Sequence, residues 1–353
     1  MKLDLEQIKS ITTGVVWVEQ EEDKIRFHRF TDQQEILYGK GKKMNVRCAA
    51  TAGVKFWFKT NSRTLKLKFE MQEGSSRRYY SFDVFVNGKA VGYLDNFSNV
   101  QLPVDYTGVQ LPLGRAEKEF VLGEGDKEVC VYFPWSVSPL LEEFSLEDGA
   151  TVIPVKPGKK LLAFGDSITQ GYDALRPSVS YISCLADKLQ AELVNKAIGG
   201  EVFFPALAES KEDFTPDYIT VAYGTNDWGT CEEAVFQENC KAFFAYLAAN
   251  YPDAKIFAIT PIWRLGYDVE RKCGPFEGIA ATIKEVTAAY ENITVISGFD
   301  FVPKDQDYFA DLRLHPNDKG FACYGDNLYD EICKIIAEGD PSLTTLPPID
   351  SDT

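Results

Sequence analysis

Short runs of alternating apolar and polar residues dominate the chain up to about residue 150. They are rich in Val, Phe, Tyr and Trp and lie at residues 54–59, 65–69, 82–86, 90–94 and 127–133. Alternation of period two is typical of strands with one buried face. The dipeptide Asn87-Gly88 separates two of these runs, which is a strong hairpin signal. We therefore expect a jelly-roll-like β-sandwich in residues 1–150.

From residue 159 onward, apolar runs alternate with helical periodicity. The expected strands are 161–164, 192–195, 218–223, 255–260 and 293–296. Apolar positions recur at helical spacing in three groups: Phe236, Cys240, Phe243, Phe244 and Leu247; Phe276, Ile279, Ile283, Val286 and Tyr290; Phe321, Tyr324, Leu328, Ile332 and Ile335. This alternation predicts a parallel sheet with helices on both faces. Prolines and glycines cluster before it, so we expect a linker at 151–158 and an α/β domain at 159–353.

The composition is that of a globular protein, with 45% hydrophobic and 13% aromatic residues. The formal net charge of −16 repels phosphate backbones and anionic membranes, so neither nucleic acid nor a membrane is expected as a partner. The N-terminus is too polar for a secretory signal, and no apolar stretch approaches membrane-spanning length. None of the eight cysteines forms a Cys-x-x-Cys pair, so we expect reduced thiols, no zinc site and a cytoplasmic location. The oligomeric state is left open.

A candidate nucleophile follows the expected strand 161–164. Ser167 lies in the segment Gly-Asp-Ser-Ile-Thr, and a serine hydroxyl attacks a substrate when a base removes its proton. The alternative is an ordinary turn or helix cap, which these residue types also favour. Only His28 and His315 are available as a base, and His28 falls in the expected sandwich. His315 precedes Pro316 at an expected loop–helix junction, where a surface or capping role is the alternative.

Two further strand ends carry residues suited to hold a developing oxyanion. Gly200 follows strand 192–195, and a glycine lets its backbone N–H approach a ligand closely. Asn226 follows strand 218–223 in the segment Gly-Thr-Asn-Asp, and its side-chain amide can donate a hydrogen bond. Taken singly, each position is equally compatible with a turn.

Taken together and in this order, these segments resemble the SGNH hydrolases, also called the GDSL esterase/lipase superfamily. The resemblance covers roughly residues 159–338 and implies a flavodoxin-like, three-layer parallel sheet. It implies that Ser167 is the nucleophile and His315 the general base. It further implies an oxyanion hole made by the N–H groups of Ser167 and Gly200 and by Asn226. The resulting acyl-enzyme mechanism needs no metal or cofactor.

One position departs from the family pattern. The family usually places an aspartate three residues before the histidine, where this chain has Leu312, and the nearest aspartate is Asp311. If the backbone bulges there, Asp311 still orients the imidazole and completes a triad. If it does not, a backbone carbonyl orients His315 and the site is a Ser-His dyad. We favour the triad.

The two-part layout is similar to that of SGNH esterases that carry a jelly roll ahead of the catalytic domain and act on acylated carbohydrates. This similarity implies an esterase for O-acetyl or other short acyl groups on a small-molecule or oligosaccharide substrate. Trp135, Trp228 and Trp263 are candidates for contact with the substrate, since aromatic faces stack on sugars. Packing within the core or between the domains is the alternative for each. Competing functions are an SGNH thioesterase or lysophospholipase, and a carbohydrate-binding protein with a degenerate hydrolase domain.

Overall fold

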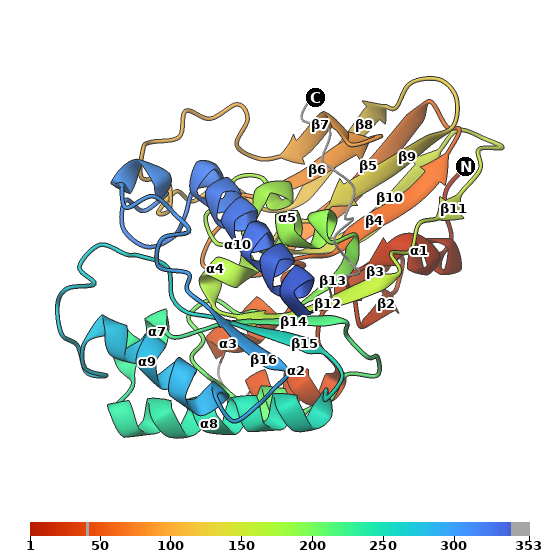
Figure 1. Cartoon of the computed structure of the whole chain (residues 1–353). Helices are drawn as coiled ribbons and strands as arrows, with labels where there is room; N and C mark the ends of the chain where they lie inside the picture. Colours follow the sequence, from red (N-terminus) through yellow and green to blue (C-terminus); the bar gives the residue numbers. More distant parts are fainter. Residues whose placement is uncertain (40–41, 340–353) are drawn as a thin grey trace.

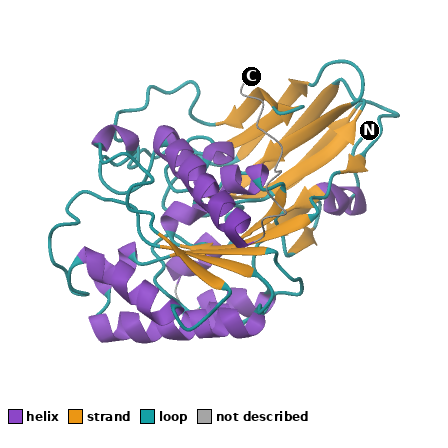
Figure 2. Cartoon of the chain, in the orientation of Figure 1, coloured by secondary structure: helices purple, strands orange, loops and turns teal. Residues whose placement is uncertain are grey.

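The computed structural model describes residues 1–39 and 42–339, and its first half is built around two antiparallel sheets (Figures 1 and 2). One sheet has the order β1-β4-β9-β6-β7, with β11 paired to β4, and the other has the order β2-β3-β10-β5-β8. Their strands are β1 (Thr12–Thr13), β2 (Trp17–Glu21), β3 (Lys24–His28), β4 (Lys55–Thr60), β5 (Thr64–Glu73), β6 (Ser81–Val86), β7 (Lys89–Asp95), β8 (Arg115–Val121), β9 (Lys127–Tyr132), β10 (Val137–Leu146) and β11 (Ile153–Pro154). The expected N-terminal β domain is confirmed.

The sandwich core follows from the alternation in the sequence. On β5 the side chains of Leu65, Leu67 and Phe69 are fully buried, whereas the lysines between them are only partly buried. Strands β4 and β9 of the other sheet contribute buried residues such as Phe56 and Val131 to the same cluster. Each strand thus places one apolar face between the two sheets, which is the arrangement that period-two alternation predicts.

Three short helices interrupt the expected all-β character of the first 150 residues. They are α1 (Leu5–Ile11), α2 (Asp32–Tyr38) and α3 (Lys42–Cys48). Asp4 and Thr31 begin α1 and α2 with capping boxes, each reciprocated by a glutamine three residues later. This Thr/Asp-x-x-Gln spacing was a readable helix-start signal. These three helices were not among the elements expected in the β-sandwich region.

The second half contains one parallel sheet in the order β13-β12-β14-β15-β16, the flavodoxin-like order that the resemblance implied. Its strands are β12 (Lys159–Gly165), β13 (Ala191–Asn195), β14 (Tyr218–Ala222), β15 (Lys255–Ile259) and β16 (Ile293–Ile296). Its helices are α4 (Ser167–Gln170), α5 (Tyr181–Lys188), α6 (Pro205–Glu209), α7 (Thr225–Thr230), α8 (Glu233–Asn250), α9 (Phe276–Thr287) and α10 (Asp318–Gly339), with 3-10 turns at Pro177–Val179 and Gln306–Tyr308.

Helices cover both faces of this sheet because its strands are apolar on both sides. In β12, Leu161 and Ala163 pack in one cluster with α5 and α10, whereas Leu162 and Phe164 pack in another with α8 and α9. Figure 1 shows α5 and α10 on one side of the sheet and α8 and α9 on the other. Phe30, just before α2, is buried in the second of these clusters, so the N-terminal segment also packs on the α/β domain.

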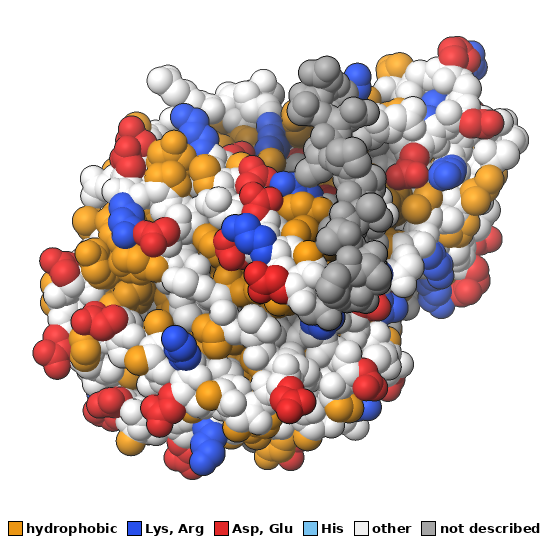
Figure 3. Space-filling view, in the orientation of Figure 1, with side chains coloured by type: hydrophobic (Ala, Val, Ile, Leu, Met, Phe, Trp, Pro, Cys, Tyr) orange, Lys and Arg blue, Asp and Glu red, His pale blue; other side chains and the backbone are white. Residues whose placement is uncertain are grey.

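The charged surface is mixed on the face shown in Figure 3, where acidic and basic side chains are interspersed. No helix within residues 1–39 and 42–339 is long and apolar enough to cross a membrane. The end of the expected α/β domain, residues 340–353, lies outside the described residues.

Candidate active site

Ser167 lies directly after β12, at the carboxyl end of the parallel sheet, as the first residue of α4. Asp166 caps this helix by accepting a hydrogen bond of 2.9 Å from the N–H of Ile168. Position 165 must be glycine, because a Cβ there would collide with the side chain of Thr169. The turn therefore sets the backbone of Ser167 at the sheet edge with its N–H free of any intrahelical partner.

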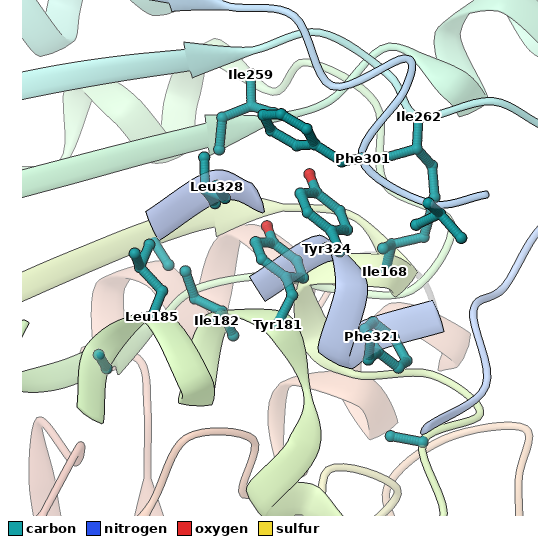
Figure 4. Close-up of a cluster of buried hydrophobic side chains, with 14 of the residues drawn as sticks. Ile168, Tyr181, Ile182, Leu185, Ile259, Ile262, Phe301, Phe321, Tyr324 and Leu328 are labelled. Carbon is teal, nitrogen blue, oxygen red and sulfur yellow. The ribbon is translucent and has the colours of Figure 1, made fainter. Parts of the chain in front are cut away.

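The short helix α4 is held in place by its apolar residue Ile168. Figure 4 shows Ile168 at the edge of a cluster formed by α5, α10 and the end of β15. Within this cluster the rings of Tyr181 and Tyr324 stack with centroids 4.0 Å apart. A cavity of about 20 Å³, room for one water molecule, lies against Asp166, Ile168 and Thr169. A four-residue helix is too short to be stable alone, so this packing positions Ser167.

The structure brings Ser167 and His315 together. His315 Nε2 lies 2.9 Å from Ser167 Oγ, although the two residues are 148 positions apart. His315 Nδ1 forms a hydrogen bond of 3.1 Å with Asp311 Oδ2. Leu312 absorbs the extra residue between the aspartate and the histidine, since its φ of +55° bulges the backbone. The other histidine is occupied elsewhere, because His28 stacks on Trp17 in the sandwich.

A second carboxylate, which the sequence analysis missed, approaches the same ring nitrogen. Asp173 Oδ2 lies 3.1 Å from His315 Nδ1, and the side chain of Asp173 is completely buried. The N-terminal domain holds it: Arg77 donates to both carboxylate oxygens at 2.6 and 2.9 Å, and Tyr79 donates through its hydroxyl. Tyr106, from the same domain, donates to the backbone carbonyl of Asp173 at 2.6 Å. No sequence motif surrounds Asp173, so the sequence analysis had no signal for it. Its backbone adopts a φ of +73°, one of the few left-handed values at a residue other than glycine.

These contacts make the imidazole a strong proton acceptor. Burial alone would lower the pKa of His315, but its contacts with Asp173 and Asp311 raise it to about 9. Burial raises the pKa of Asp173, yet the hydrogen bonds from Arg77 and His315 overcome this and hold the pKa below the usual range. The same balance, with His315 as the partner, lowers the pKa of Asp311. At neutral pH both carboxylates are charged, and each can stabilise the imidazolium formed when Ser167 loses its proton.

Besides Ser167, the candidate oxyanion donors are Gly200, in the loop after β13, and Asn226, in the first turn of α7. Gly200 adopts a φ of +82°, and its N–H has no hydrogen-bond partner in the part of the chain that the structure describes. Gly199 before it is pressed against the ring of Tyr172, where a Cβ would approach to 2.6 Å. The side-chain amide of Asn226 donates to the Glu201 carbonyl at 3.0 Å, which joins α7 to the Gly200 loop and leaves the second N–H of the amide available.

The three tryptophans pack against protein rather than face open space. Trp135 is 3% exposed, and its indole N–H donates to the Ala174 carbonyl at 2.8 Å between the two domains. Trp228 is fully buried, and its N–H donates to the Gly274 carbonyl at 2.9 Å. Trp263 is 8% exposed and packs on Phe309. All three tryptophans therefore have the packing role that was the alternative to substrate contact, and the proposed substrate site does not include them.

Comparison with known proteins agrees with this geometry. Residues 163–323 match the GDSL-like Lipase/Acylhydrolase family. No curated protein matches the sequence.

Solved structures with the same fold extend over the N-terminal domain as well. The chain is similar to the Salicylyl-Acyltransferase SsfX3 from a tetracycline biosynthetic pathway, with 19% identity, a TM-score of 0.75 and coverage of 92% of this chain and 94% of that one. It is similar to a family two carbohydrate esterase from Cellvibrio japonicus, with 16% identity, a TM-score of 0.63 and coverage of 94% and 96%. A family two carbohydrate esterase from Clostridium thermocellum, solved with cellohexaose, has 16% identity, a TM-score of 0.61 and coverage of 81% and 93%.

Proposed function

Because the α/β domain belongs to the GDSL-like lipase/acylhydrolase family over residues 163–323, we propose that this carboxylic ester hydrolase removes O-acetyl or other short acyl groups by way of a covalent intermediate on Ser167. The observation that carries the proposal is the 2.9 Å contact between Ser167 Oγ and His315 Nε2. A serine within hydrogen-bond reach of an imidazole that carboxylates orient is the arrangement needed for nucleophilic acyl transfer.

In the proposed mechanism, His315 takes the proton of Ser167 as the hydroxyl attacks the ester carbonyl. The N–H groups of Ser167 and Gly200 and the amide of Asn226 hold the oxyanion of the tetrahedral intermediate. His315 then gives the proton to the leaving alcohol, and an acyl-enzyme remains. Water, deprotonated by the same imidazole, attacks this ester and releases the acid.

A carbohydrate is the proposed carrier of the acyl group. The support is the whole-chain similarity to family two carbohydrate esterases, which includes the domain ahead of the sheet. The short acyl group is tested by measuring kcat/KM for 4-nitrophenyl esters from acetate to decanoate. We expect the maximum at two to four carbons, at least about tenfold above octanoate, because a pocket filled by a short acyl group has no room for further methylenes, and forcing them in costs about 1–3 kcal/mol.

Other outcomes of this series overturn the proposal. A maximum at eight carbons or more would favour the lysophospholipase or thioesterase alternatives. Turnover of no ester, combined with binding of an unacylated oligosaccharide, would favour a carbohydrate-binding protein with an inactive hydrolase domain.

A strong pH dependence is expected from His315. The base acts only when neutral, and its pKa is raised to about 9 by the two carboxylates. Therefore kcat/KM for a neutral ester should rise roughly tenfold per pH unit between pH 6 and 8 and level off near pH 9. Initial rates with 4-nitrophenyl acetate, corrected for spontaneous hydrolysis, measure this profile. A flat profile from pH 5 to 8 would contradict the role of His315.

Acyl transfer to an alcohol is the second candidate, suggested by the similarity to an acyltransferase along 92% of the chain. The same acyl-enzyme serves both reactions, and only the acceptor differs. Adding glycerol or xylose to the ester assay separates them: new ester products, detected by mass spectrometry at the expense of free acid, indicate transfer.

A further inference from the structure

Arginines without a carboxylate partner gather at the candidate active site. Six arginines in the sandwich and between the domains are paired with acidic residues within 4.0 Å: Arg26, Arg63, Arg77, Arg78, Arg115 and Arg176. Arg29, which is fully buried, has no acidic partner among the described residues, but its donors are used by four backbone carbonyls. In the described part of the chain, four others that lie near the carboxyl end of the parallel sheet form no such pair: Arg47, Arg264, Arg271 and Arg313. In a chain with a net charge of −16, free arginines at this one place need an explanation.

Arg264 is the most unusual of them because it is only 6% exposed. One nitrogen, Nη1, donates to the hydroxyl of Thr225 at 3.0 Å, and its guanidinium lies 5.3 Å from the ring centre of Trp228. Its Nε is buried without any hydrogen-bond partner among the described residues. A buried guanidinium with unused donors is costly unless a ligand completes its hydrogen bonds. Thr225 directly precedes Asn226, so this guanidinium contacts the first turn of α7, the helix that carries one of the proposed oxyanion donors.

Two more guanidinium groups add positive charge around Arg264. Arg271 lies over the same Trp228 ring, 4.4 Å from its centre. The N–H of Leu265 donates to the carbonyl of Arg313 at 2.9 Å, which joins the Arg264 loop to the segment that carries His315. Burial, together with the charges of Arg271 and Arg313, lowers the pKa of Arg264 to about 10, so it stays charged at neutral pH.

Arg47 brings a fourth guanidinium to the other oxyanion loop. Its Nη1 donates to the carbonyl of Gly199 and lies 3.0 Å from the point where a Cβ of Gly200 would stand. Asn226 of α7 donates to the carbonyl of Glu201, so the loop that Arg47 contacts at Gly199 is joined to the helix that Arg264 contacts at Thr225.

The carboxylates near these arginines are already engaged. Asp311 accepts from three backbone N–H groups and from His315. Asp173 is bound by Arg77 and Tyr79, and Asp166 caps α4. The arginine donors are thus left for something outside the chain.

We propose that Arg264, with Arg271 and Arg313 beside it and Arg47 at Gly200, binds a carboxylate or phosphate group of the ester substrate. The inference rests on the proposed ester hydrolysis and names the charge of its substrate. Planar guanidinium groups bind such anions through paired hydrogen bonds. Their local positive field also offsets the repulsion that a strongly acidic protein exerts on an anionic substrate.

Two pairs of esters, matched except for charge, test the proposal on the wild-type protein. Mono-4-nitrophenyl glutarate and 4-nitrophenyl valerate differ in the acyl part, and 4-acetoxybenzoate and 4-acetoxybenzamide differ in the alcohol part. At low ionic strength, kcat/KM should be at least about tenfold higher for the charged member of one pair, and 0.5 M NaCl should reduce this preference. The pair that shows this preference tells whether the anionic group is carried by the acyl part or by the alcohol part of the substrate. No preference for the charged member of either pair would overturn the proposal, whereas failure to hydrolyse even the neutral esters would overturn the proposed function.

Variants assign the preference to Arg264. Arg264→Gln should lower kcat/KM for the charged ester by roughly 10- to 100-fold and for its neutral partner by less than threefold. Arg264→Lys should retain part of the preference. Arg115→Gln, the matched control on β8, makes the same change in charge and should alter neither ester. An equal loss of kcat/KM for both esters in Arg264→Gln would show that Arg264 is structural and would contradict the proposal. If that variant does not fold, two measurements replace it: the charged-ester preference of the variant Arg313→Gln, at an exposed arginine, and the salt dependence of that preference in the wild-type protein.

Discussion

Ser167→Ala is expected to lower kcat for 4-nitrophenyl acetate by about 10⁴- to 10⁶-fold, because within residues 1–39 and 42–339 no other hydroxyl forms a hydrogen bond with the His315 ring. A small residual rate over water should remain, since the oxyanion donors are untouched. The fold should survive, because the change removes one hydroxyl and one hydrogen bond, worth about 0.5–1.5 kcal/mol of unfolding free energy. Stopped assays with purified protein, together with thermal unfolding, measure both effects.

The matched control is Ser183→Ala, which removes a similarly buried, hydrogen-bonded hydroxyl from α5 without touching the site. It should keep kcat within about threefold. A Ser167→Ala protein that is folded and hydrolyses esters within tenfold of the wild-type rate would exclude a covalent intermediate at this serine.

The double variant Asp173→Asn/Asp311→Asn is expected to lower kcat by about 10⁴-fold, because nothing then stabilises the imidazolium or fixes its tautomer. Each single variant should cost less, about 10- to 100-fold, since the remaining carboxylate still lies 3.1 Å from Nδ1. The two single variants should lose activity to a similar extent, because both carboxylates lie at the same distance from Nδ1. The pH midpoint of kcat/KM should fall below 9 in both single variants, since one charge that raises the pKa of His315 is lost.

Stability must be separated from catalysis in these variants, because Asp173 is also the partner of half-buried Arg77. Asp95→Asn is the matched control. The side chain of Asp95 is 3% exposed and lies 2.7 Å from Arg176, and this ion pair does not involve His315. It should lose comparable thermal stability and keep the pH midpoint of the wild type. If Asp173→Asn behaves like this control, with an unshifted midpoint, Asp173 does not act on the imidazole.

The sequence predicted the sheets well because burial there follows local periodicity. The alternation in β5 and the double-sided apolar character of β12 depend only on neighbouring residues, and both strands lie where expected. The short helices α1 and α2 were missed because strand-like neighbours outweighed their capping signals. Phe30 then packs on the distant α/β sheet, a contact that no local pattern records.

For the candidate site, the sequence pointed to groups whose spacing is carried by a family motif. Ser167 and His315 meet as expected, and the bulge at Leu312 lets Asp311 reach the ring despite its shifted position. Asp173 and Arg264 escaped attention because their roles arise from tertiary contacts. Asp173 follows a short helix and Arg264 lies in a long loop, and neither position is distinctive in the sequence. Only the folded structure brings Asp173 to Nδ1 of His315 and Arg264 to Thr225, the residue before Asn226.

The hydrogen bonds from Arg77 and Tyr79 to Asp173 limit how the two domains of this protein can be separated or recombined. A fragment starting at β12 would retain the complete family segment and yet lose the two side chains that anchor one of the carboxylates at His315. The halves therefore cannot be exchanged as independent modules. A chimera that borrows its front half from a relative must supply an arginine and a tyrosine in the same register, or accept a misaligned base.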